Sequence, residues 1–121
     1  IEVCFEPSNK TTLWTSHILH GHNIAAKYIR PKGIKRPDFK TFSGIFKDIS
    51  MDTIYLQDTQ QKLFIKLLGN DNLYDVHKQW WFAKGHMSPD ADFVTEAEQD
   101  ATYYYINALP QWQAVNNGNW K

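Results

Sequence analysis

The sequence has little cysteine, no excess of charge of either sign and no long apolar run. The single cysteine, Cys4, cannot form a disulfide within the chain. It is therefore either a small residue in an apolar strand or half of a bond to sequence outside these residues. No run approaches the roughly 20 apolar residues of a membrane span. Zero net charge argues against a strongly basic, non-specific coat for nucleic acid, but it is compatible with a local basic cleft.

The 121 residues suit a single domain, 1–121, without repeats, low-complexity segments or an internal linker. Aromatic residues are abundant, at 15%. The chain begins at Ile1 rather than at methionine, as a mature or trimmed product would. Asn9-Lys10-Thr11 is a glycosylation sequon in a polar turn. Together these two features favour a secreted, extracellular protein.

The pattern of apolar and turn-forming residues predicts an α+β domain. A hairpin is expected at the N-terminus, followed by a third strand and a basic loop, with the boundaries 1–5, 12–19, 24–29 and 30–40. Helical spacing predicts a helix over 57–68, ended by Gly69, and a shorter one over 73–77. Strands are expected over 80–83 and 103–109, the second ended by Pro110. Further helices should begin at Thr95, which has a capping-box pattern with Glu98, and near Gln111.

The stretch "WWFAKGHMSPDADF", residues 80–93, places His86 directly after a strand-like aromatic run. Neutral imidazole can accept a proton from water near neutral pH. Asn116 follows the next strand, at the expected start of a short helix. Its amide oxygen is a hard ligand suited to Mg²⁺ or Ca²⁺, although an asparagine-rich end is also typical of turns. A base and a hard ligand on a strand–strand–helix frame are what a phosphodiester hydrolase needs.

Three linked segments in this region resemble the motifs of the DNA/RNA non-specific endonuclease family. The matching residues are Gly85, His86 and Pro89, then Asn107, Pro110 and Gln111, then Asn116, Gly118 and Trp120. The alanine before the basic residue and the Ser-Pro-Asp-Ala-Asp after the histidine are most similar to secreted arthropod nucleases, including the crustacean duplex-preferring type. The similarity in style extends to "IEVCFEP" and "YLQDTQQKLFIKLLG", and so through nearly the whole chain.

The resemblance implies a ββα-metal fold with a central antiparallel sheet and flanking helices. It implies a Mg²⁺-dependent endonuclease with little sequence specificity, with DNA and also RNA as candidate substrates, and with 5′-phosphate products. His86 would be the general base, and Asn116 the direct Mg²⁺ ligand, with Mn²⁺ or Ca²⁺ as substitutes. Asn107 would support the site from behind or through metal-bound water. Lys84 stands where the family usually has arginine, keeping the charge but losing the bidentate fork.

The densest basic run, "KYIRPKGIKR", ends at Arg36, the candidate for the upstream arginine with which the family contacts phosphate. We expect Arg30, Lys35 and Arg36 to contact substrate. The alternative is a solvated loop. A nuclease without net charge must concentrate its positive field somewhere.

Several other residues allow a chemical and a structural interpretation. His17, His20 and His22 could belong to a zinc site, but structural or hydrogen-bonding roles are favoured because no second cysteine pair is present. Asp90 and Asp92 could be a metal-binding pair, but their positions are typical of turn and cap residues.

The tyrosine run 103–105 could stack bases or lie in the core, and the core is favoured for most of it. Family members are longer than this chain and carry a further acidic residue on the helix after Asn116. We therefore expect either a second polypeptide that completes the fold or an incomplete fragment. The alternative function is a catalytically impaired relative that binds nucleic acid or acts as a secreted interaction or structural protein.

Overall fold

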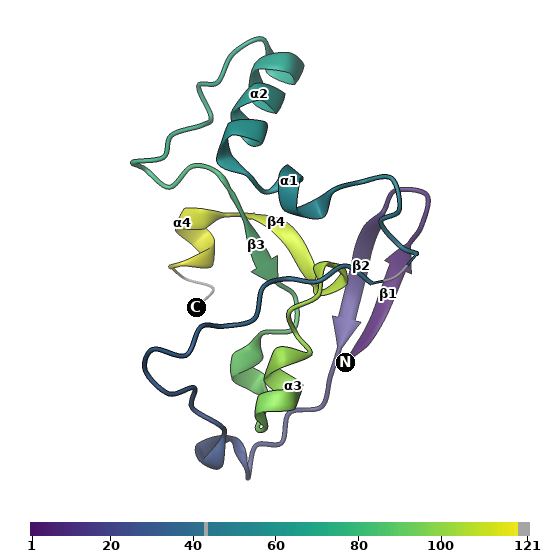
Figure 1. Cartoon of the computed structure of the whole chain (residues 1–121), viewed down its shortest axis with the longest axis vertical. Coiled ribbons are helices and arrows are strands. Elements are labelled where there is room, and N and C mark those ends of the chain that lie inside the picture. The colour runs from purple at the N-terminus through teal and green to yellow at the C-terminus, as the bar shows by residue number, and fades with distance from the viewer. Residues whose placement is uncertain (43, 119–121) are drawn as a thin grey trace.

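The computed structural model describes residues 1–42 and 44–118 (Figure 1). Within these residues, two small antiparallel sheets and short helices are joined by long irregular segments. The predicted mixture of α and β structure is confirmed. A single central sheet is not confirmed, because the strands of the described residues pair two by two, as β1–β2 and β3–β4.

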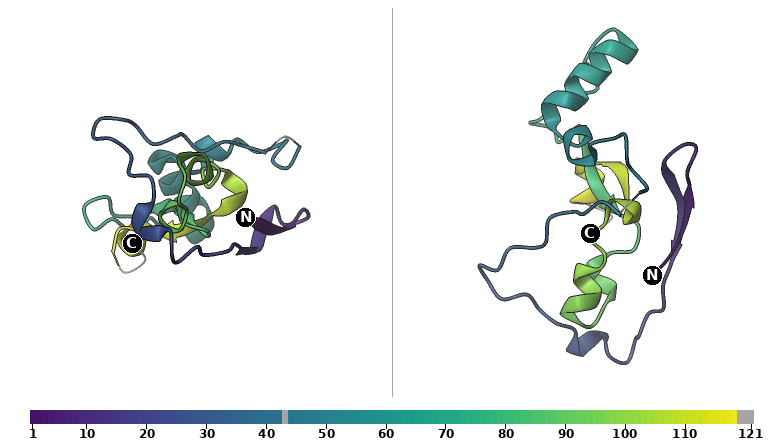
Figure 2. Two further views of the ribbon diagram at one scale, coloured as in Figure 1. Left: turned by 90° about the horizontal axis from the view of Figure 1, so that it is seen from below. Right: turned by 45° about the vertical axis from the view of Figure 1, so that its right-hand side comes forward.

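The N-terminal hairpin consists of β1 (Glu2–Glu6) and β2 (Thr11–Ser16), as the sequence predicts. Its register runs from Glu2 opposite Ser16 to Glu6 opposite Thr11, with an irregularity after Cys4, which is a half-buried free cysteine. The hairpin stands to one side of the other elements (Figure 2). The buried Thr12 hydroxyl donates to the Ile106 carbonyl at 2.6 Å, and this bond anchors the hairpin to the centre of the protein.

The strand predicted over 24–29 is not formed. This segment contains only the 3-10 helix η1 (Ile24–Ala26) and then becomes irregular, continuing into the predicted basic loop. Isolated backbone hydrogen bonds, rather than a continuous strand pairing, hold this segment. The Tyr28 amide donates to the Val94 carbonyl, the Lys40 amide donates to the Tyr103 carbonyl, and the Lys40 carbonyl accepts from the Tyr105 amide. The loop is therefore held alongside the tyrosine run without belonging to a sheet.

Helices α1 (Met51–Ile54) and α2 (Gln57–Leu68) follow the loop. The bounds of α2 match the prediction, and Gly69 ends it in the left-handed conformation, with φ of 75°. The helix predicted over 73–77 is instead a turn, closed by paired backbone bonds between Asp75 and Trp80. None of the described helices combines the length and apolar character needed to cross a membrane.

The second sheet pairs β3 (Phe82–His86) with β4 (Ala108–Trp112), and α4 (Gln113–Asn116) follows β4 directly. Between the two strands lie η2 (Asp90–Asp92), α3 (Glu96–Asp100) and η3 (Tyr105–Asn107). Thr95 and Glu98 form the predicted capping box of α3. The strand predicted over 103–109 is wrong: residues 105–107 form a 3-10 turn, and β4 begins later and runs through Pro110.

The hydrophobic core lies where α1, the basic loop and η3 meet. Phe46, Tyr55 and Tyr105 are buried there, and Phe39 packs against them. Tyr103 and Tyr105 are 4% and 1% exposed, which confirms the core role predicted for most of the tyrosine run.

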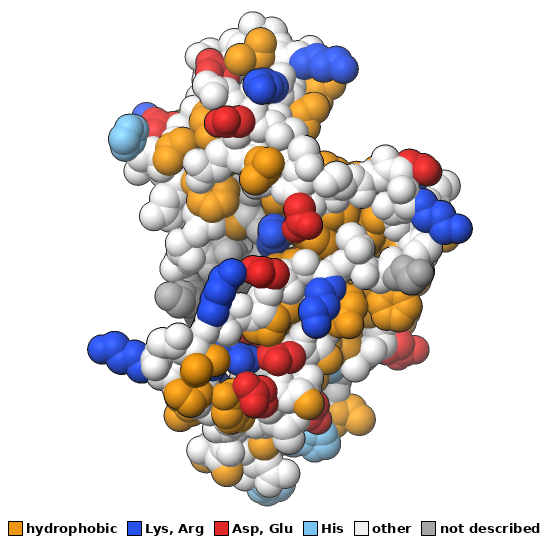
Figure 3. Space-filling view, viewed as in Figure 1, with side chains coloured by type: hydrophobic (Ala, Val, Ile, Leu, Met, Phe, Trp, Pro, Cys, Tyr) orange, Lys and Arg blue, Asp and Glu red, His pale blue; other side chains and the backbone are white. Residues whose placement is uncertain are grey.

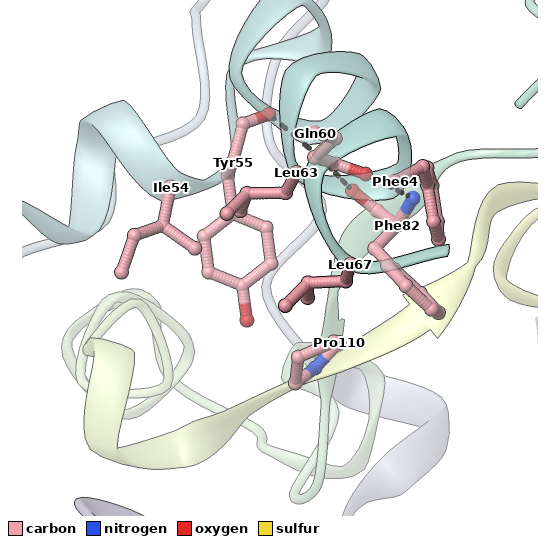
Figure 4. Close-up of a pocket in the computed structure, with 8 residues that line it drawn as sticks. All are labelled: Ile54, Tyr55, Gln60, Leu63, Phe64, Leu67, Phe82 and Pro110. Atoms are coloured by element: carbon pink, nitrogen blue, oxygen red, sulfur yellow. Dashed lines mark hydrogen bonds between the residues drawn. The ribbon is translucent and has the colours of Figure 1, made fainter. Parts of the chain in front are cut away.

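Helix α2 is attached to β3 through one buried polar side chain, Gln60 (Figure 4). Its amide nitrogen donates to the Phe82 carbonyl at 2.8 Å and to the Tyr55 carbonyl at 3.2 Å, and its amide oxygen accepts from the Phe82 amide at 2.7 Å. These bonds cross the edge of an apolar pocket of about 170 Å³ between α2, β3 and Pro110. The Gln60 side chain thus bonds both backbone groups of Phe82, as a neighbouring strand would.

Replacing Gln60 with leucine should lower the free energy of unfolding by about 2–4 kcal/mol, because backbone groups of Phe82 and Tyr55 lose their partner in a buried place. Gln61→Leu on the same helix is the matched control, since within the described residues its side chain bonds only that of Asp71. Urea unfolding followed by circular dichroism measures both. Equal effects of the two substitutions would contradict the role given to Gln60.

Candidate active site

His86 is the last residue of β3, and its ring is held between two aromatic side chains. The Phe39 ring lies 5.0 Å from it, and the buried Tyr103 ring meets it edge-on at 4.8 Å. The Tyr103 hydroxyl donates in turn to Asp90 at 2.8 Å. These contacts come from three segments far apart in the sequence, and they fix the plane of the imidazole.

The surroundings of His86 favour its neutral form. Burial lowers the pKa of His86 below its ordinary value of 6.5, and the positive charge of Arg36 lowers it further, while Asp90 opposes them. Arg36 and Asp90 themselves form a long ion pair, with 4.0 Å between Nε and Oδ2. A neutral imidazole can accept a proton at neutral pH, which is what a general base requires.

Gly85 is required by close packing rather than by an unusual backbone angle. A Cβ at this position would lie 2.5 Å from Oε1 and 2.7 Å from Cβ of Gln111 on β4. Gln111 therefore folds directly over the backbone that precedes His86. The cleft beside this face has a volume of about 450 Å³ and extends from His86 and Met87 to Leu13 and Trp14 of β2.

Asn107 lies behind His86 and is only 2% exposed. Its amide oxygen accepts from the Ser88 amide at 2.9 Å, and its amide nitrogen donates to the carbonyls of Ser88 and Thr102 at 2.8 and 2.9 Å. The Met87 amide donates to the Asn107 carbonyl at 3.0 Å. These contacts tie Asn107 to the residues that follow His86 and commit both of its amide protons to backbone carbonyls.

Lys84 lies two residues before His86 in β3, so the two side chains point to the same face of the strand. Its ammonium nitrogen lies over three rings, 5.1 Å from Tyr105, 5.5 Å from Phe39 and 5.9 Å from Tyr55, and 3.8 Å from Asp52. Asp52 also accepts from the Tyr105 hydroxyl. The aromatic cage holds a positive charge close to the histidine.

The three cations predicted to contact substrate differ in how exposed their side chains are. Arg36 lies nearest to His86, through Asp90, and its side chain is 71% exposed. Lys35 is also exposed and pairs with Asp38. Arg30 is only 16% exposed and pairs with Glu96 and Asp100 of α3. Lysine and arginine side chains are interspersed with acidic ones on the face seen in Figure 3.

Asn116 ends α4, and its half-buried side chain makes no hydrogen bond within the described residues. The start of α4 bonds to the backbone of Trp81 and Gln79, beside the beginning of β3, whereas His86 ends that strand. No described contact joins the two residues, so their pairing in one metal site stays a prediction. An amide oxygen that has no hydrogen-bond partner among the described residues fits Mg²⁺, which keeps several waters and needs few protein ligands.

The other predicted alternatives are resolved in part. The described residues contain no group of three histidine, cysteine or acidic side chains that could hold a metal. His17 instead lies 3.0 Å from both Ser88 and Asp92. Asp90 and Asp92 face different partners, Tyr103 and His17, as turn residues do. The motif residue Trp120 lies outside the described residues.

Sequence reasoning missed Phe39, Asp52 and His17 as parts of the site. Phe39 and Asp52 come from the basic loop and α1, and nothing in their local pattern marks them. A structural or hydrogen-bonding role was expected for His17, but nothing in its local sequence indicates the distant serine and aspartate with which it interacts.

The comparisons with known proteins identify the family of this chain. The model of the DNA/RNA non-specific endonuclease family matches residues 1–121. The chain belongs to this family, as the motif resemblance predicted.

Insect salivary proteins are among its relatives. A salivary endonuclease of Lutzomyia longipalpis is 35% identical over 119 residues, covering 98% of this chain and 27% of the relative. The salivary protein Tsal1 of Glossina morsitans morsitans is 40% identical over 120 residues, covering 98% of this chain and 29% of the relative. A salivary endonuclease of Culex quinquefasciatus is 28% identical, covering 90% of this chain and 26% of the relative.

The chain thus spans between a quarter and a third of the length of these curated relatives. No solved structure shows significant similarity to it.

Substituting Gly85 with alanine should disturb the end of β3, because the new methyl group meets both ends of the Gln111 side chain. We expect a loss of about 1–3 kcal/mol in the free energy of unfolding, as for other overpacked positions. Gly21→Ala is the matched control, because a Cβ there has no neighbour within 4 Å. Thermal unfolding of both variants measures the difference, and a Gly85→Ala protein as stable as Gly21→Ala would refute the packing argument.

Proposed function

We propose that this chain carries the catalytic histidine of a Mg²⁺-dependent endonuclease of ββα-metal type, which hydrolyses phosphodiester bonds with little sequence specificity. The observation that carries the proposal is the setting of His86, a motif histidine held between Phe39 and Tyr103 in surroundings that lower its pKa. DNA is the proposed substrate, and RNA is a further candidate. The family membership and the strand–strand–helix order of β3, β4 and α4 support this assignment.

The proposed role of His86 is to take a proton from the attacking water. The water oxygen forms a bond to phosphorus, the bond from phosphorus to the 3′ oxygen breaks, and the product keeps a 5′-phosphate. His86 then holds the proton that the water gave up. Its aromatic neighbours orient the ring, and its lowered pKa leaves the ring ready to accept this proton at neutral pH.

The cations have separate proposed tasks. Lys84 supplies positive charge next to the reacting phosphate, without the planar fork that arginine would offer. Arg36 and Lys35 contact neighbouring phosphates, since both are exposed and only weakly paired. Arg30, predicted to act with them, is held more firmly by α3.

Asn116 would hold Mg²⁺ through its amide oxygen, with Mn²⁺ or Ca²⁺ as substitutes. The bound metal would neutralise charge on the phosphate and on the leaving oxygen. Secretion is part of the proposal, supported by the salivary names of the relatives and by the sequon. A further segment or a second polypeptide that completes the domain is proposed on the ground that the relatives are longer.

His86→Ala should lower plasmid cleavage at least 100-fold, because general-base catalysis typically contributes 10²–10⁴-fold. EDTA should abolish cleavage by the unaltered protein, and added Mg²⁺ should restore it. His77→Ala is the matched control, because His77 is exposed and its only described hydrogen bond is made by its backbone. A well-folded protein that never cuts would favour the alternative function, a nucleic-acid-binding or interaction protein of the same family.

The pH dependence of kcat/KM should reveal the lowered pKa of His86. Since the neutral form is active, the rate should rise with pH to a plateau, with a midpoint below 6.5. Arg36→Ala removes a charge that lowers this pKa, so the midpoint should move upward. Asp90→Asn removes a charge that raises it, so the midpoint should move downward.

The profiles are to be measured at one saturating Mg²⁺ concentration. Shifts of the same sign in the two variants would contradict the assignment of the midpoint to His86.

A further inference from the structure

A chain of hydrogen bonds behind His86 joins β2 to the loop that follows the histidine. The Ser88 hydroxyl donates to the Thr15 hydroxyl at 2.9 Å and lies 3.0 Å from Nδ1 of His17. Nε2 of His17 lies 3.0 Å from Oδ2 of Asp92, a carboxylate that can only accept when ionised. The backbone of the same serine is fixed on its other side by Asn107.

Serine, histidine and aspartate in hydrogen-bonding order are also the components of a nucleophilic triad. Ser88, however, is 0% exposed, and its single hydroxyl proton is already given to Thr15. A nucleophile must reach its substrate, and this hydroxyl cannot. The cluster is therefore suited to holding the backbone in place rather than to covalent chemistry.

The cluster is well placed to orient His86. Ser88 is two residues after the histidine, and Asp92 closes the same short loop. Between them lies Asp90, which accepts from the Tyr103 hydroxyl, and the Tyr103 ring packs edge-on against His86. A movement of this loop would therefore reach the histidine both along the chain and through Tyr103.

His17 is the residue that joins the exit of the N-terminal hairpin to the loop after His86. Its ring uses both nitrogens, and it packs against Phe93 at 5.0 Å, with only 16% of the side chain exposed. Thr15 and His17 belong to the N-terminal hairpin and its exit, more than 70 positions before their partners. Few side chains could bond a hydroxyl on one edge and a carboxylate on the other at these distances.

We propose that His17 is a positioning residue of the active site, acting through Ser88 and Asp92 on the orientation of His86. This inference rests on the proposed function for its catalytic consequence. The bridge ties β2 to the loop 87–92, whose other described contacts are those with Asn107, those of Asp90 with Tyr103 and Arg36, and the bond from Lys27 to the Ala91 carbonyl.

The test compares His17→Ala, Ser88→Ala and the double variant in the intact protein. Ser88→Ala is the milder change, because the backbone bonds to Asn107 remain, and it carries the test if His17→Ala does not fold. Each single variant should lower kcat for plasmid cleavage on the order of 10- to 100-fold, since small displacements of a catalytic group have such effects. KM should stay within about twofold, because neither side chain contacts substrate.

The double variant should be no slower than the slower single variant, because both substitutions break the same bridge. His22→Ala, a replacement of an exposed histidine in the neighbouring turn, is the matched control and should leave kcat unchanged. The proposal would be overturned if the single variants kept kcat within about twofold of the unaltered protein. It would also be overturned if the kcat losses of the two single variants multiplied in the double variant.

Amide hydrogen exchange gives a readout that does not depend on activity. Exchange in residues 87–93 should accelerate in both single variants, while α2 should stay as protected as before. If the unaltered protein does not cut DNA but this local acceleration is found, the proposed function fails and the bridge to the loop stands. If the protein cuts DNA and exchange in 87–93 does not change, the positioning role is wrong and the proposed function stands.

Discussion

The arrangement around the candidate site depends on one buried amide, that of Asn107. The side chain accepts one bond and donates two, and its partners lie both in the loop after His86 and in the turn after α3. Aspartate of the same shape would lack both donors, and an apolar residue would leave three buried backbone groups unpaired, each costing about 1–3 kcal/mol. The backbone groups of Ser88 and Thr102 thus require an asparagine at this position, and the loop that follows His86 is held in place by it.

Charge pairing is the second constraint on the site. Each of the four cations assigned to phosphate has a carboxylate beside it: Lys84 has Asp52, Arg36 has Asp90, Lys35 has Asp38, and Arg30 has both Glu96 and Asp100. A polyanion would have to compete with these acids. Exposed pairs contribute little free energy, so Arg36 and Lys35 can turn to a phosphate at small cost. The more enclosed Arg30 is better suited to fixing α3 against the loop than to leaving it.

Local signals predicted the parts of the fold that local interactions determine. The hairpin, α2 with its glycine end and the capping box of α3 all follow from residues within a few positions of one another. The apolar run 103–109 misled because burial in a 3-10 turn and burial in a strand produce the same pattern. Pro110 was expected to end a strand, yet it lies inside β4. Among the described strands β4 pairs only with β3, so its other edge is unpaired, and a proline, which has no amide proton, is tolerated there.

The motif also predicted which residue should act as the base, but not what holds it. Gly85, His86 and Asn107 belong to the family motifs, whereas Phe39 and His17 come from segments outside those motifs. His17 was expected to have a structural or hydrogen-bonding role rather than a zinc ligand's role, and its bonds to Ser88 and Asp92 agree with that expectation. Its partners are 71 and 75 positions away, a separation at which spacing carries no information. The position of the proposed base is therefore encoded locally in the sequence, whereas the contacts that would orient it come from segments that only the folded chain brings together.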